Sequence, residues 1–378
     1  MPIQLKITRA DLRPPSSKRI DAQSGQVYTQ LASAPKTTHT NGPSWVHESP
    51  FLPAGWEDRS ARGAASLKHI AMRQVLSDQR VLSPSLFDTV PWRTARYLWE
   101  CLGRSGKQTL YMWKLFATAY PADFPARSPH RAMKIEGPLL PMPQYLAMVR
   151  SDAQRWRTVL TLAASFARVP DMVGVADIRN LVALEVASPA TATAASVPEG
   201  AETPMTAVSD RIVRTWGELA QTAEAFARVR VVRFTNQAEV TGVVLRYLKA
   251  FPALRVVIAC GCSRLRPTPE VMDGWVLDEM EEPQAALYAC YMGVVKEEVA
   301  QAGGSAEACK EGPVLDFQIG RKRRRDNIEI LVFRRVQSDE GERAPKKLKE
   351  STEKRPVKKA VMKKRPAQDL GSLLGGFM

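Results

Sequence analysis

The sequence predicts an α/β fold, a short and irregular solenoid of strand-and-helix repeats with an N-terminal helical cap and disordered ends. Three observations predict this architecture. A strand-and-helix phrase recurs at an offset of 25 residues, aromatic residues recur at helical spacing before it, and both ends of the chain are rich in charge or in Pro, Ser and Thr. With 378 residues, 44% of them hydrophobic, the chain is long enough to bury a substantial core.

The N-terminal segment, residues 1–60, has little apolar periodicity and contains the stretches PPSSKR and SAPKTTHTNGPS. We expect it to be disordered or loosely draped over the fold. A helical cap region is predicted over residues 61–150. Its first short helix begins near Ser66, where apolar residues start to recur at helical spacing.

Two further helices are predicted between Leu86 and Tyr120, the most aromatic part of the chain. Pro91 suits a first helical turn, and the second helix follows the turn at 103–106. We interpret the two apolar stripes as the buried core of a helical pair, with a protein-docking face as the alternative. The stripes consist of Trp92, Ala95, Trp99 and Leu102, and of Leu110, Trp113, Phe116, Ala117 and Tyr120.

The repeat signal lies in residues 151–336, which we predict to form one domain with a loop insertion at 188–209. Two successive units and an earlier strand share an L-x-x-L-x-L phrase, and a polar or cysteine residue closes the turn in the two units. A short strand of this kind turns apolar residues inward, a helix returns the chain, and each unit needs a stacked neighbour. The phrase residues are Val229, Val232, Phe234 and Gln237; Leu254, Val257, Ala259 and Cys262; and Leu181, Leu184 and Val186.

Further parts of the array are expected around this signal. Leu245 and Leu248 supply the helix between the two units, and the 48 residues between Leu181 and Val229 leave room for one intervening repeat. Apolar runs at 159–162 and 328–333 could supply more strands. An irregular α/β domain that carries the phrase by chance is the alternative.

This phrase resembles the cysteine-containing leucine-rich-repeat proteins found behind F-box motifs, especially an uncharacterised fungal group. The good match covers residues 229–266, with weaker support from 155–228. Residues 86–102 resemble the opening of an F-box, with Pro91 and Leu98 as its skeleton, although that skeleton also occurs in many capped helices. The resemblance implies a ubiquitin-ligase substrate adaptor that selects a protein partner.

No residue pattern predicts catalysis, a cofactor or a metal site. The four histidines all precede residue 131 without metal-ligand spacing, and no phosphate-binding or nucleophile-elbow motif is present. Cys262 is expected to pack in a turn, and five scattered cysteines indicate a reducing compartment. The acidic run 278–282 is interpreted as a solvated loop or helix start. No stretch of 18 apolar residues predicts a membrane span.

The C-terminal segment, residues 337–378, is predicted to be a disordered basic tail. Residues 321–366 hold 18 lysines and arginines against 7 acidic residues. We expect these clusters to bind a nuclear import receptor or phosphates, with a merely solubilising role as the alternative. The predicted residues are Arg321, Lys322, Arg323, Arg324, Arg325, Lys346, Lys347, Lys349, Lys354, Arg355, Lys358, Lys359, Lys363, Lys364 and Arg365.

The last residues of the chain carry an apolar stripe at helical spacing, formed by Leu370, Leu373, Leu374 and Phe377. Because such a stripe is costly to leave in water, we expect it to dock into a groove of a partner or onto the body.

The functional hypothesis from sequence is a non-enzymatic nuclear protein-interaction scaffold, with the ubiquitin-ligase adaptor as its specific form. The alternative is a nucleic-acid-associated factor, in chromatin or ribosome assembly, that uses the basic tail. An enzyme of unfamiliar type is a third hypothesis without a supporting motif.

Overall fold

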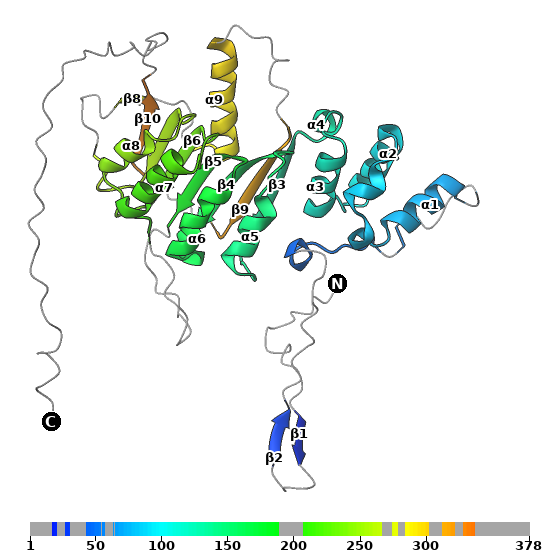
Figure 1. The fold of residues 1–378 in the computed structure, drawn as a ribbon. Coiled ribbons are helices and arrows are strands. Elements are labelled where there is room, and N and C mark those ends of the chain that lie inside the picture. Colours follow the sequence, from blue (N-terminus) through cyan, green and yellow to red (C-terminus); the bar gives the residue numbers. More distant parts are fainter. Residues whose placement is uncertain are drawn as a thin grey trace, which may run out of the picture. The chain divides into compact units, whose positions relative to one another are not determined.

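The computed structural model describes residues 17–20, 27–30, 43–53, 55–56, 63, 65–188, 207–266, 274–278, 284–301, 312–321 and 328–336. The chain divides into two units, Met1–Val336 and Gln337–Met378, and the second lies outside the described residues. The first unit contains a mixed α/β structure (Figure 1), which confirms the predicted α/β class. It also contains a separate hairpin of two antiparallel strands, β1 (Ser17–Ile20) and β2 (Val27–Gln30).

The central sheet has eight described strands, and their order in space differs from their order along the chain. The first six strands in the sheet are parallel, and β10 is antiparallel to both β7 and β8. In spatial order they are β3 (His130–Ile135), β9 (Val314–Ile319), β4 (Arg157–Ala163), β5 (Leu181–Ala187), β6 (Val231–Thr235), β7 (Val256–Cys260), β10 (Ile330–Arg335) and β8 (Trp275–Asp278).

Helices cover both faces of this sheet. On one face, four helices share an apolar core with the sheet: α5 (Met142–Val149), α6 (Val169–Gly174), α7 (Asp210–Thr222) and α8 (Val243–Leu248). On the other face, α9 (Leu287–Gln301) packs against β4, β5 and β6 around a second apolar cluster. Burial on both faces explains why all seven residues of β5 are buried and why all of them except Glu185 are apolar.

The strand, helix and strand predicted at 229–262 are present as β6, α8 and β7, but no helix lies between β7 and β8 among the described residues. Phe234 on β6 lies in register with Ala259 on β7, and Leu245 and Leu248 of α8 are fully buried beneath them. The buried Gln237 side chain closes the turn, since its amide nitrogen donates to the carbonyls of Val186 and Thr235, both at 3.1 Å. The first predicted unit is therefore confirmed, and of the second only the strand.

The prediction of a leucine-rich-repeat solenoid is wrong. In a solenoid each repeat contacts only its neighbours in sequence, whereas β9 is inserted between β3 and β4. The run at 328–333 contributes to an antiparallel strand rather than to another repeat. No intervening repeat separates β5 from β6, because Val186 pairs directly with Phe234. The long interval holds α7 instead, and most of the predicted insertion at 188–209 lies outside the described residues.

The aromatic stripes before the sheet form a packed core. Helices α1 (Leu67–Leu76), α2 (Trp92–Arg104), α3 (Leu110–Ala119) and α4 (Phe124–Arg127) lie in this region. Trp99, Phe116 and Phe124 contact one another with ring centroids 4.9–5.8 Å apart, and all three are buried. The core interpretation is therefore confirmed. Upstream, Trp45 packs on Tyr111 with ring centroids 5.0 Å apart.

Candidate functional site

Five arginines from distant parts of the chain meet at one edge of the sheet. Parallel strands begin at the same edge, and an antiparallel strand ends there. Arg157 opens β4, while Arg230 and Arg255 directly precede β6 and β7. Arg334 and Arg335 close β10, and the amide of Arg335 donates to the carbonyl of Arg255 at 2.9 Å. We call these five residues the arginine edge.

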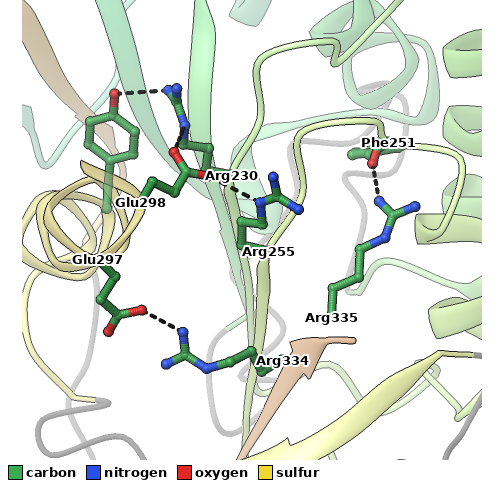
Figure 2. Close-up of polar contacts among 8 residues, drawn as sticks. Arg230, Phe251, Arg255, Glu297, Glu298, Arg334 and Arg335 are labelled. Atoms are coloured by element: carbon green, nitrogen blue, oxygen red, sulfur yellow. Dashed lines mark hydrogen bonds and ion pairs between the residues drawn. The ribbon is translucent and has the colours of Figure 1, made fainter. Parts of the chain in front are cut away.

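Helix α9 supplies most of the carboxylates of the arginine edge, as Figure 2 shows. Glu298 accepts from Nε of Arg230 at 2.8 Å and from Nε of Arg255 at 3.1 Å, so one carboxylate bridges two arginines. Glu297 accepts from Nη1 of Arg334 at 2.5 Å. The last described carboxylate is Asp278 at the end of β8, which accepts from Nε of Arg334 at 2.5 Å.

Arg157 and Arg335 also donate to uncharged oxygen atoms. Arg335 donates to the main-chain carbonyls of Phe251 at 2.7 Å (Figure 2) and Lys249 at 3.1 Å. Arg157 donates to the Tyr291 hydroxyl at 2.6 Å and to the Gly312 carbonyl. Burial lowers the pKa of Arg335, and the nearby positive charge of Arg255 lowers it further.

Part of the arginine edge is accessible to solvent. Among the described residues, the guanidinium groups of Arg230, Arg255 and Arg334 contact three carboxylates. The side chains of Arg255 and Arg334 are 36% and 35% exposed, so solvent and solutes can reach them. Clustered, partly exposed guanidinium groups favour anions with several oxygen acceptors, and phosphates above all.

None of the site residues predicted from sequence lies in the arginine edge. Arg321 is exposed just after the carboxyl end of β9, at the opposite edge of the sheet. Lys322–Arg325, all predicted basic residues from Lys346 to Arg365, and the stripe Leu370–Phe377 lie outside the described residues. The sequence does hold one signal for the missed site, because single arginines stand at the start of three apolar runs.

A second polar cluster lies inside the sheet. Glu185 on β5 and Arg233 on β6 are each 1% exposed, and their charged atoms are 3.6 Å apart. Thr235 donates to Glu185 at 2.8 Å, and Arg233 donates to the Ala285 carbonyl at 2.9 Å. Arg233 also donates to the sulfur of Cys290 on α9 at 2.9 Å. This pair joins two strands to the first turns of α9.

The described residues also bear on the cysteines, on metal binding and on membrane spans. Cys101, Cys260, Cys262 and Cys290 are buried and form no disulfide with one another, and burial raises the pKa of the Cys262 thiol to about 11. Over this part of the chain, no group of three or more His, Cys, Asp or Glu residues could hold a metal ion. None of the helices described is long and apolar enough to span a membrane.

Comparison with known proteins gives no family assignment. No protein-family model, curated protein or solved structure matches the chain. The leucine-rich-repeat and F-box resemblances therefore rest on the quoted residues alone.

Proposed function

We propose that this protein binds nucleic acid through the phosphate backbone, using the arginine edge together with the basic tail. The observation that carries the proposal is the clustering of partly exposed guanidinium groups, those of Arg255 and Arg334, at the edge where β10 ends. The basic tail begins at Gln337, two residues after Arg335 in the sequence.

The composition of the tail supports binding that is independent of base sequence. Residues 337–366 contain 11 lysines and arginines against 5 acidic residues and no aromatic residue. Base recognition in single strands depends largely on aromatic stacking, whereas lysine and arginine contacts to phosphates release counterions whatever the sequence. Affinity should therefore fall steeply with salt.

The test is fluorescence anisotropy with the full-length protein and labelled duplex DNA or RNA over a salt series. We expect Arg335→Gln to weaken binding and to reduce the slope of log affinity against log salt by about one, the effect of one lost phosphate contact. Arg96→Gln is the matched control, because Arg96 lies on α2 and pairs with Glu100. If Arg335→Gln and wild type give the same affinity and slope, the arginine edge does not contact nucleic acid.

The remaining functional predictions from sequence are proposals that await their own tests. They are nuclear localisation through an import receptor, a protein-interaction scaffold or ubiquitin-ligase adaptor, the absence of enzymatic activity, and docking of the C-terminal apolar stripe. Comparing the proteins that co-purify with the full-length chain and with a chain lacking residues 367–378 tests the docking.

A further inference from the structure

A polar cavity of about 370 Å³ lies among the helices that precede the sheet. Three segments distant in sequence meet around it: residues 47–49, the loop 106–109 between α2 and α3, and Arg131 on β3. Its volume is in the range of small-molecule sites, yet it has no apolar side chain in its lining. The lining residues are His47, Glu48, Ser49, Gly106, Lys107, Gln108, Thr109 and Arg131.

The one carboxylate among the described lining residues is already engaged. One oxygen of Glu48 accepts from Nη2 of Arg131 at 2.7 Å, and the other accepts from the main-chain N–H of Leu110 at 2.6 Å. Leu110 is the first residue of α3, a ten-residue helix whose amino end carries partial positive charge. Glu48 therefore serves to position Arg131 and to cap α3.

The loop that carries Lys107 is held in place by the fully buried Gln79. Its amide nitrogen donates to the Lys107 carbonyl at 3.0 Å, and its amide oxygen accepts from the Thr109 hydroxyl at 2.6 Å. Lys107 is half-buried as a residue, and its ammonium has no ion-pair or hydrogen-bond partner among the described residues. The backbone is thus fixed while the charged group is left available.

The charges around the cavity favour an anion. Lys107 and Arg131 are positive, Glu48 is negative, and burial lowers the pKa of His47, which keeps it neutral near pH 7. One positive charge is therefore in excess. The Ser49 hydroxyl accepts weakly from the Phe51 N–H at 3.4 Å, and its own hydrogen can be donated to a ligand.

We propose that this cavity binds a small phosphate-bearing molecule. A phosphoryl group offers three strong acceptor oxygens and nearly two negative charges, which match the Lys107 ammonium and the Ser49 hydroxyl. The polar character of the described lining disfavours a ligand with a large apolar body. The cavity shares no residue with the arginine edge, so phosphate binding in it can be tested independently of nucleic-acid binding.

The test is calorimetric titration of the full-length protein, at constant ionic strength, with inorganic phosphate and with glycerol 3-phosphate. We expect saturable binding to wild type and affinity at least about tenfold weaker for Lys107→Gln, the effect of losing one charge-assisted hydrogen bond. Ser49→Ala, which changes a residue at the exposed rim, should weaken binding about threefold. Tighter binding of glycerol 3-phosphate supports an esterified ligand, and equal affinities support recognition of the phosphoryl group alone.

Lys134→Gln is the matched control, because Lys134 is exposed on the same strand as Arg131. It should bind both phosphates like wild type, which separates the cavity from general attraction to a basic protein. Two results would overturn the proposal: no saturable binding to wild type, or an equal loss of affinity in Lys107→Gln and Lys134→Gln. Equal melting temperatures of all variants without phosphate show that the fold is unchanged.

Discussion

At the scale of single residues, the Glu185–Arg233 pair is the most unusual feature of the sheet interior. Both side chains are almost completely buried in a sheet whose faces are otherwise largely apolar. Removing charges from water costs several kcal/mol per ion, and the mutual attraction repays this only when the partners stay together. The pair therefore fixes β5 against β6 more than it adds net stability.

Glu185→Leu should lower the free energy of unfolding by about 3–5 kcal/mol, because Arg233 loses the only carboxylate it contacts among the described residues. The double variant Glu185→Leu/Arg233→Met should recover most of this loss, since it removes both charges. Urea denaturation of the two variants measures the difference. A single variant within about 1 kcal/mol of wild type would show that the pair does not matter for folding.

Lys114 on α3 makes the free energy of unfolding depend on pH in the alkaline range. Burial lowers the pKa of its ammonium from 10.5 to about 8, although the group donates to the Met148 carbonyl at 2.9 Å and lies 5.1 Å from the centroid of the Trp156 ring. Between these two pKa values the unfolded lysine is protonated and the folded lysine is largely not. Stability from this group is therefore gained as pH rises from 8 toward 10.5.

Lys114→Met should raise the free energy of unfolding at pH 7 by about 1 kcal/mol, because the buried charge is gone. The gain over wild type should shrink between pH 8 and 9.5, which denaturation curves at both pH values will show. A difference between the two proteins that is constant over this range would contradict the assigned cause.

At the scale of elements, two helix-interior glycines differ sharply in their surroundings. A Cβ on Gly217 of α7 would lie 2.9 Å from the carbonyl oxygen of Tyr247 on α8, so this glycine allows the two helices to approach closely. A Cβ on Gly293 of α9 would meet nothing within 4 Å. The same substitution should therefore have opposite effects at the two positions.

Gly217→Ala should lower the free energy of unfolding by about 1–3 kcal/mol, because α7 and α8 must move apart. Gly293→Ala should raise it by about 0.5–1 kcal/mol, the usual gain of alanine over glycine inside a helix. Thermal unfolding of both variants is the measurement. Stabilisation by Gly217→Ala would mean that the α7–α8 contact is looser than described here.

At the scale of the whole molecule, α9 connects the buried Glu185–Arg233 pair inside the sheet with the arginine edge. Cys290 in its first turn accepts a hydrogen bond from Arg233, and Glu297 and Glu298 in its later turns bind arginines of the arginine edge. The Glu297 and Glu298 carboxylates neutralise part of the positive charge of the arginine edge. Charge at one edge of the sheet therefore depends on the placement of a helix that lies on one face.

Glu298→Gln should strengthen binding of duplex DNA about threefold or more at low salt, because Arg230 and Arg255 lose their shared carboxylate. The salt slope should steepen by up to about one. Anisotropy titrations at two salt concentrations measure both quantities. Glu218→Gln serves as the control, since among the described residues Glu218 forms an ion pair with the exposed Arg214 on α7, away from the arginine edge. An equal response of the two variants would argue against a role for the arginine edge.

Each structural feature that the sequence predicted correctly has its signal within a short stretch of residues. Phe234 and Ala259 were placed on neighbouring strands because a phrase repeats within 25 residues. Trp99 and Phe116 were placed in a core because helical spacing is a local pattern. The predicted solenoid failed because the phrase describes one face of a strand and says nothing about which distant strand lies beside it.

The sequence by itself determined the α/β class, the strand, helix and strand at 229–262, the aromatic core and the surplus of positive charge, because periodicity and composition are read along the chain. The tertiary structure alone decided that β9 enters between β3 and β4, that five scattered arginines share an edge, and that Lys107 and Arg131 line one cavity. These arrangements join residues from separate elements of the chain. They arise from the pairing of strands and the packing of helices, and no local sequence pattern specifies which distant segment will be the partner.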